Sequence, residues 1–116
     1  MSSKTPLFRG VVANTETQYV PVPVNTDGTI GLHIGWKDGT SDADITLETT
    51  SIPAQFAPHD EDGDAWQWVE EDVSIAGPEG ESAGATSVHV DNVRNQRARL
   101  KIEASADTDI EVWKGW

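Results

Sequence analysis

The sequence predicts an all-β protein, an antiparallel β-sandwich of jelly-roll type with about eight short strands. Apolar and polar residues alternate with a period of two along several stretches, and these stretches recur at a spacing of roughly ten residues. Turn-forming Gly, Pro, Asp and Asn separate them, and no apolar period of 3.6 residues persists for three helical turns. The 116 residues suffice for one two-layer core, so a single domain is expected.

The expected strands begin near the N-terminus with residues 18–24, "QYVPVPV". Pro21 and Pro23 cannot donate to a strand ladder, so residues 1–24 are expected to be an extended N-terminal arm or an edge strand. The sandwich domain should then span residues 25–116. Its strands, each with alternate apolar residues facing inward, are predicted at "TIGLHIGW" (29–36), "DITLETT" (44–50), "TSVHVDNV" (86–93), "ARLKIEA" (98–104) and "TDIEVWK" (108–114).

The connections predict how these strands pair. Asp-Gly in "NTDGT" (25–29) and in "KDGTSD" (37–42) is a strong hairpin signal, whereas "AGPEGESAGA" (76–85) is typical of a flexible loop. The last two strands are expected to form a hairpin in which Ile102 pairs with Ile110 or with Thr108, since both isoleucines must face the core. In either register Arg99 and Lys101 would find acidic or aromatic partners on the neighbouring strand.

The charge of the chain is strongly negative, at −12, and unevenly placed. Between Asp38 and Val93 there are fourteen Asp or Glu residues and no Lys or Arg. Such a surface repels phosphate, so nucleic-acid binding is not expected. No apolar run approaches membrane-span length, and "MSSKTPLFRG" lacks the apolar segment of a secretory signal, so we expect synthesis in the cytoplasm. Without cysteine there are no disulfides or thiolate zinc sites.

The most acidic stretch is "HDEDGDAWQWVEED", residues 59–72. Asp60, Asp62, Asp64 and Glu71 stand at positions 1, 3, 5 and 12 of an EF-hand spacing, but the sixth position, which needs glycine, is alanine. The flanking residues do not form amphipathic helices. The stretch is therefore either a β-type calcium site built from the three aspartates or a solvated acidic turn.

Tryptophans and basic residues provide the other candidate sites. Trp66 and Trp68 share one face of an expected strand, which makes them a stacking platform for sugar rings or, the favoured interpretation, two core residues. Trp113 and Trp116 lie where a partner chain could cover them. The basic ridge, which comprises Arg94, Arg97, Arg99 and Lys101, could dock on the acidic face of a neighbouring copy or pair within its own sheet.

Catalysis has little support in the sequence. His33, His59 and His89 are scattered, and His33 and His89 fall on outward faces of strands. There is no cysteine nucleophile, no Gly-x-Ser-x-Gly elbow and no Gly-rich phosphate loop. A non-enzymatic protein without a cofactor is expected, apart from the calcium alternative.

With its "GWKDGTSDADITLETT" segment and its C-terminal "RARLKIEASADTDIEVWKGW", this short acidic β chain resembles small β-sandwich virion proteins of tailed bacteriophages, of the capsid decoration, cement or head-fibre type. The resemblance implies a virion location, many copies in one particle, and no chemistry. It also implies a homo-oligomer, with a trimer favoured, and docking on a major capsid or other virion protein. Two alternatives stay open. One is a carbohydrate-binding module that uses Trp66, Trp68 and the 60–64 acidic loop, with or without calcium, and the other is a structural domain of a larger assembly.

Overall fold

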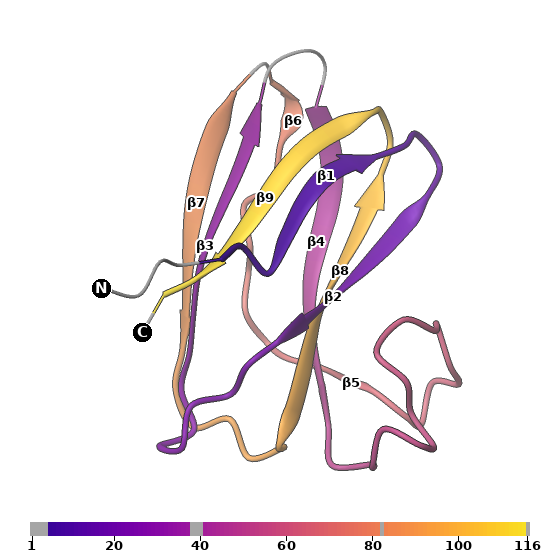
Figure 1. Ribbon diagram of the computed structural model, residues 1–116, viewed down its shortest axis with the longest axis vertical. Coiled ribbons are helices and arrows are strands. Elements are labelled where there is room, and N and C mark those ends of the chain that lie inside the picture. The colour runs from indigo at the N-terminus through magenta and orange to yellow at the C-terminus, as the bar shows by residue number, and fades with distance from the viewer. Residues whose placement is uncertain (1–4, 38–40, 82, 116) are drawn as a thin grey trace.

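Two antiparallel β-sheets pack against each other in the computed structural model, which describes residues 5–37, 41–81 and 83–115 (Figure 1). The four-stranded sheet has the order β1 (Phe8–Val12), β9 (Thr108–Lys114), β3 (Ile30–Lys37) and β7 (Gly84–Val90). The five-stranded sheet has the order β2 (Thr17–Val22), β8 (Arg97–Ala104), β4 (Ser41–Thr50) and β5 (Val69–Glu70), and β6 (Glu79–Glu81) also pairs with β4. No helix in the described ranges is long and apolar enough to cross a membrane.

The strand order confirms the predicted β-sandwich and identifies it as a jelly roll. β1 pairs with β9, β2 with β8, β3 with β7, and β4 with β5, as in one long hairpin folded over on itself. The contacts of β9 with β3 and of β8 with β4 then complete the two sheets. Consecutive strands therefore alternate between the sheets from β1 to β4 and again from β7 to β9, which is the jelly-roll arrangement.

The core lies between the sheets and consists of the residues that the period-two pattern points inward. Buried side chains from β3, β4, β8 and β9 dominate it, and those with no measurable exposure are Ile30, Ile34, Leu47, Ala98, Leu100, Ile102, Ile110 and Val112. Burying such aliphatic side chains contributes roughly 1.5–3 kcal/mol each. The remaining predicted positions agree, except that Val90 is half-buried.

The expected C-terminal hairpin is wrong. β8 and β9 belong to different sheets, so Ile102 lies opposite Ile45 of β4 while Ile110 lies opposite Trp36 of β3. Both isoleucines do face the core, as expected. In a sandwich this requirement can be met from opposite sheets as well as from adjacent strands, and inward-facing alternation does not distinguish the two.

Neither Asp-Gly signal joins two strands of the same sheet. Residues 25–29 form a closed turn in which Gly28 has a φ of 78° and the Asn25 amide donates to the Thr29 carbonyl oxygen at 2.9 Å, yet this turn joins β2 to β3 across the sandwich. β3 and β4 likewise lie in different sheets, and residues 38–40 between them fall outside the described ranges.

The expected flexible loop at residues 76–85 contains a short strand. β6 pairs with the start of β4, and the Ala43 amide donates to the carbonyl oxygen of the buried Pro78 at 3.1 Å. Gly77 makes this close approach possible, because a Cβ there would lie 2.6 Å from the Ala43 carbonyl oxygen. The composition of residues 76–85 predicted a loop because the residues of β6 have no strand preference of their own. The strand is stabilised by its pairing with β4.

The N-terminal segment contributes one strand to each sheet. Within the described part of residues 1–24, β1 and β2 lie at the edges of the four-stranded and five-stranded sheets. The proline of β2, Pro21, stands opposite Arg99 at an edge, where a missing backbone donor is tolerated.

Candidate functional site

The connection from β4 to β5, residues 51–68, folds back over the outer face of the five-stranded sheet (Figure 1). We call it the β4–β5 loop. It starts with a turn in which the amides of Phe56 and Ala57 both donate to the carbonyl oxygen of Pro53, at 2.9 and 3.0 Å. Its position is set mainly by arginines from β8, which project outward because their neighbours Ala98 and Leu100 face the core.

Arg99 holds the centre of this loop. Its guanidinium donates to the backbone carbonyl oxygens of His59 (3.1 Å), Glu61 and Asp62 (3.2 Å), and its Nε pairs with Glu48 on β4 at 2.8 Å. The side chain is only 1% exposed. A buried charge is tolerated when it is paired and its donors are used, and both conditions hold here.

Two aromatic rings close over the same guanidinium. The Cζ of Arg99 lies 4.0 Å from the ring centroid of Tyr19 on β2 and 4.0 Å from that of Trp68 in the loop. Each stacking contact is a cation–π interaction, worth about 2 kcal/mol where water is excluded. Arg99 therefore joins β2, β4 and the loop. We call Arg99 and the side chains around it the arginine cluster, which comprises Tyr19, Glu48, His59, Trp68, Arg97 and Arg99.

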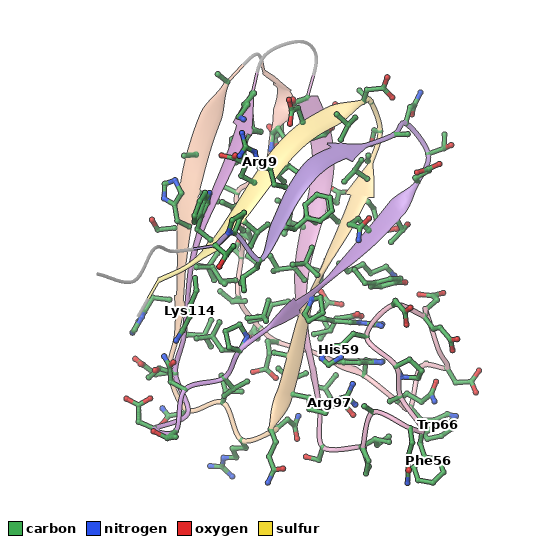
Figure 2. All side chains as sticks on the ribbon, viewed as in Figure 1. Arg9, Phe56, His59, Trp66, Arg97 and Lys114 are labelled. Carbon is green, nitrogen blue, oxygen red and sulfur yellow. The ribbon has the colours of Figure 1, made fainter. Side chains whose placement is uncertain are left out.

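Arg97 holds the first half of the loop. Its guanidinium donates to the carbonyl oxygens of Ile52 (2.6 Å) and Ala57 (2.7 Å) and contacts His59 Nδ1 at 3.0 Å (Figure 2). It also lies 5.4 Å from the Trp68 ring centroid, and His59 stacks on the same ring at a centroid distance of 5.6 Å. Because the guanidinium has only donors, Nδ1 of His59 must be the acceptor, which requires an unprotonated nitrogen there.

The electrostatics of the arginine cluster agree with this geometry. Burial, followed by the positive charges of Arg97 and Arg99, lowers the pKa of His59 below its usual value of 6.5. Burial, followed by the charge of Arg99, also lowers the pKa of Arg97. His59 is thus held neutral, as its contact with Arg97 demands.

A second contact fixes the acidic part of the loop. The Tyr19 hydroxyl donates to Asp62 Oδ1 at 2.6 Å, and Lys101 Nζ lies 3.5 Å from the same oxygen. The hydrogen bond from Tyr19, followed by the charge of Lys101, lowers the pKa of Asp62. Burial and the bond to Asp62 raise the pKa of Tyr19 far above its usual range.

The three aspartates predicted as a calcium site are exposed and not grouped. Within the described ranges no set of three or more His, Asp or Glu side chains lies close enough together to hold a metal ion. Asp60 and Asp64 point to solvent, whereas the carboxylate of Asp62 is engaged by Tyr19 and Lys101. Calcium binding stays a prediction, and it would require Asp62 to leave both partners.

The two loop tryptophans have different environments, so they do not form a shared platform. Residues 65–67 form a turn and not a strand. Trp68 is 7% exposed, yet it is buried within the arginine cluster on the outside of the sheet instead of in the core between the sheets. Trp66 is 70% exposed. The expectation that both are core residues is thus wrong for Trp66, and for Trp68 it is right about burial but not about place.

Exposed apolar side chains gather at the outer end of the loop. Of the four large hydrophobic residues that are exposed in the described ranges, Phe56 and Trp66 belong to the loop, Val69 is the first residue of β5, and Val11 lies on β1. Figure 2 shows Phe56 and Trp66 at the same outer end, away from the sheets. We call these two residues the aromatic tip.

Gln67 fixes the aromatic tip internally. Its Nε2 donates to the carbonyl oxygen of Phe56 at 2.8 Å, and its Oε1 accepts from the Asp64 amide at 2.6 Å. Gly63, with a φ of 72°, makes room for this amide group, since a Cβ there would lie 2.5 Å from Gln67 Oε1. The aromatic tip is therefore part of an ordered loop that is bonded in its first half, at its centre and across its outer turn.

The residues predicted as a partner interface are dispersed. Arg97 and Arg99 are covered by their own chain, Lys101 is half-buried, and Arg94 is exposed in the connection before β8. Trp113 is half-buried on the outer face of the other sheet, and Trp116 lies outside the described residues. The basic ridge thus finds acidic and aromatic partners, as expected, although they come from β2, β4 and the β4–β5 loop instead of β9.

Sequence reasoning missed two residues of this site. Phe56 gave no signal, because a single phenylalanine between Pro53 and Pro58 belongs to no periodic segment. Tyr19 was expected only as part of an edge strand. Its outward direction followed from the alternation of β2, but its two partners are distant in the sequence. No protein-family model matches the chain, and no curated protein or solved structure matches it either.

Proposed function

We propose that this chain is a non-enzymatic structural protein that self-associates through the aromatic tip. The observation that carries the proposal is the combination of a 70% exposed Trp66 and a 62% exposed Phe56 with a loop that Arg97 and the buried Arg99 hold in place. Exposed aromatic residues on a preorganised support are typical of binding hot spots, because little conformational entropy is lost when they are covered.

The cost of ordering the loop supports a role for the tip. A solvated turn would need neither two arginines nor the burial of Trp68. Here six polar contacts of Arg97 and Arg99 position a segment whose outer end exposes Phe56 and Trp66. The partner we propose is the aromatic tip of neighbouring copies, so that apolar surfaces meet around a symmetry axis.

The setting we propose is the virion of a tailed bacteriophage, which rests on the resemblance described above. A jelly roll alone does not assign this role, since the same fold carries unrelated functions. In that setting many copies crowd together, and an acidic exterior keeps them soluble while the aromatic tip supplies a short-range attraction. Attachment to a capsid protein would then use other surfaces of the assembled oligomer.

Sedimentation velocity tests the self-association directly. We expect a concentration-dependent oligomer that moderate salt strengthens, because salt screens the repulsion between chains of charge −12. Trp66→Ser and Phe56→Ser should each weaken the association constant about 30-fold or more, which corresponds to the ~2 kcal/mol of a hot-spot residue. Val11→Ser, which removes an exposed hydrophobic residue on β1, should have no effect.

A monomer at every concentration and salt would overturn the proposal. So would an oligomer that is unchanged by both tip substitutions. Because Phe56 and Trp66 are largely exposed, the variants should fold, and equal thermal unfolding midpoints would confirm that they do.

A further inference from the structure

The outer face of the four-stranded sheet carries a second surface feature, far from the aromatic tip. A hollow of about 520 Å³ lies over β9, β3 and β7, and its lining includes Trp113, His33, Ser87, His89 and Gly31. Its volume is within the range of small-molecule sites, roughly 300–1,000 Å³. The proposed self-association does not use it.

The strand register explains how the hollow is built. Trp113 lies opposite His33, and His33 lies opposite Ser87, so the three form one row across three neighbouring strands. Adjacent strands are about 4.8 Å apart, so this row spans roughly 10 Å. In the next row Gly31 lies opposite His89, and the absence of a side chain at Gly31 leaves a floor beside the indole.

The lining combines Trp113 with the hydrogen-bonding side chains of His33, Ser87 and His89 and with one lysine, Lys114. Trp113 is half-buried, whereas His33, Ser87 and His89 are exposed. His89 is oriented by a contact of 3.1 Å between its Nε2 and the carboxylate of Asp91. No carboxylate is among the described residues that line the hollow itself.

This chemistry selects among ligand classes. A pyranose ring has an apolar C–H face that can stack on an indole and hydroxyls at its edge that can bond imidazole and serine groups. A purely apolar occupant would leave those polar groups desolvated and unpaired, at a cost of roughly 1–3 kcal/mol each. Lys114 is the one Lys or Arg in the described lining, and it stands against a net chain charge of −12, which opposes the approach of an anionic ligand.

We propose that this hollow is a binding site for neutral saccharides, in which Trp113 stacks on a pyranose ring and His33, Ser87 and His89 bond its hydroxyls. The inference does not depend on the proposed self-association. It also differs from the platform expected from the sequence, because it uses another tryptophan on the other sheet.

Fluorine NMR of the full chain labelled with 5-fluorotryptophan tests the site, with Trp113 as the reporter. The probes are the methyl glycosides of glucose, galactose, mannose and N-acetylglucosamine, with glucuronate as the anionic comparison and glycerol as the polyol control. We expect at least one neutral glycoside to shift the Trp113 resonance saturably and the Trp66 resonance not at all. Glycerol should shift neither resonance.

Two substitutions retain the reporter and change the site. Ser87→Leu fills the hollow and His33→Ala removes a hydrogen-bonding group, so each should weaken the glycoside affinity roughly tenfold or more. Val11→Ala, at an exposed position on β1 of the same sheet, should leave it unchanged. The spectra of the unbound variants show whether they fold, which Ser87 and His33 should allow because both are exposed.

Several results would overturn the inference: no saturable shift with any neutral glycoside, a shift that survives Ser87→Leu, or a stronger response to glucuronate. A Trp113 resonance that responds only to protein concentration would also overturn it, since the hollow would then be a contact between copies. None of these results bears on the association measured through Trp66, so the two proposals fail separately.

Discussion

A single arginine determines where the β4–β5 loop lies. In the folded chain the Arg99 guanidinium contacts three backbone carbonyls, one carboxylate and two aromatic faces. These groups take the place of the water that it would otherwise bind. The planar fork matters as much as the charge, because a lysine ammonium cannot reach partners in these directions at once. The alternation of β8 predicted that Arg97 and Arg99 face outward, but not that a segment some forty residues earlier would cover them.

Replacing Arg99 separates the contributions of fork and charge. Arg99→Ala leaves Glu48 and several carbonyls unpaired, so we expect the free energy of unfolding to fall by about 3–5 kcal/mol. Arg99→Lys keeps the charge and loses the fork, for an expected loss of about 1–3 kcal/mol. Urea unfolding measures both, with Arg94→Ala as the exposed control, expected within about 0.5 kcal/mol of wild type. An Arg99→Ala variant as stable as its control would contradict the arginine cluster.

The neutral state of His59 predicts how stability depends on pH. Because its pKa is lowered in the folded chain, the unfolded chain binds more protons between that value and 6.5. The free energy of unfolding therefore rises with pH across this window, and His59 makes it smaller as the pH falls below about 6.5. His59→Gln should flatten this part of the curve, measured by urea unfolding between about pH 5 and 7, whereas Trp66→Ser should keep the wild-type slope. An unchanged slope in His59→Gln would contradict a half-buried imidazole that is held neutral.

At the scale of elements, the sequence predicts strands better than their partners. Alternation placed β3, β4, β8 and β9 within a few residues, because burial of one face is a local pattern. Pairing is not local: Ile102 and Ile110 satisfy the same inward requirement from opposite sheets, which is why the hairpin was wrong. The strand expected around Trp66 and Trp68 forms only at Val69–Glu70, as β5, and β6 was missed because it has no alternating apolar pattern of its own; the long β4 stabilises both.

The segment before β6 packs closely on β4 at Gly77, and this contact can be tested by substitution. Gly77→Ala places a Cβ 2.6 Å from a backbone oxygen, which cannot move aside as a side chain would. We expect a loss of about 1–3 kcal/mol, the typical cost of overpacking. Gly10→Ala on β1 is the matched control, since its Cβ meets only the Phe8 ring at 3.6 Å, and it should be neutral or slightly stabilising. Thermal unfolding compares the two, and equal midpoints would contradict the close approach.

At the scale of the whole molecule, repulsion between like charges works against packing. The jelly roll brings together strands that are far apart in the sequence, while the net charge of −12 opposes compaction. The apolar core and the local pairs of the arginine cluster overcome this repulsion. The overall charge was readable from the sequence, whereas the exposure of Phe56 and Trp66 was not, because it depends on how the whole loop is folded.

Salt should therefore stabilise the folded chain. Between about 0.01 and 0.3 M NaCl the Debye length falls from about 30 Å to below 10 Å, so repulsion among exposed carboxylates weakens. We expect the unfolding midpoint to rise by a few degrees and then level off, equally in NaCl and KCl. A midpoint that falls with salt would mean that exposed ion pairs outweigh the general repulsion.

Fluorine NMR on the 5-fluorotryptophan-labelled chain as a function of its own concentration is the most direct test of the proposed self-association. If the aromatic tip is the contact between copies, the Trp66 resonance should shift or broaden as the oligomer forms. The resonances of Trp36 and Trp68, which are already buried, should stay in place. An oligomer that forms while Trp66 keeps its solvent-exposed resonance would contradict the account.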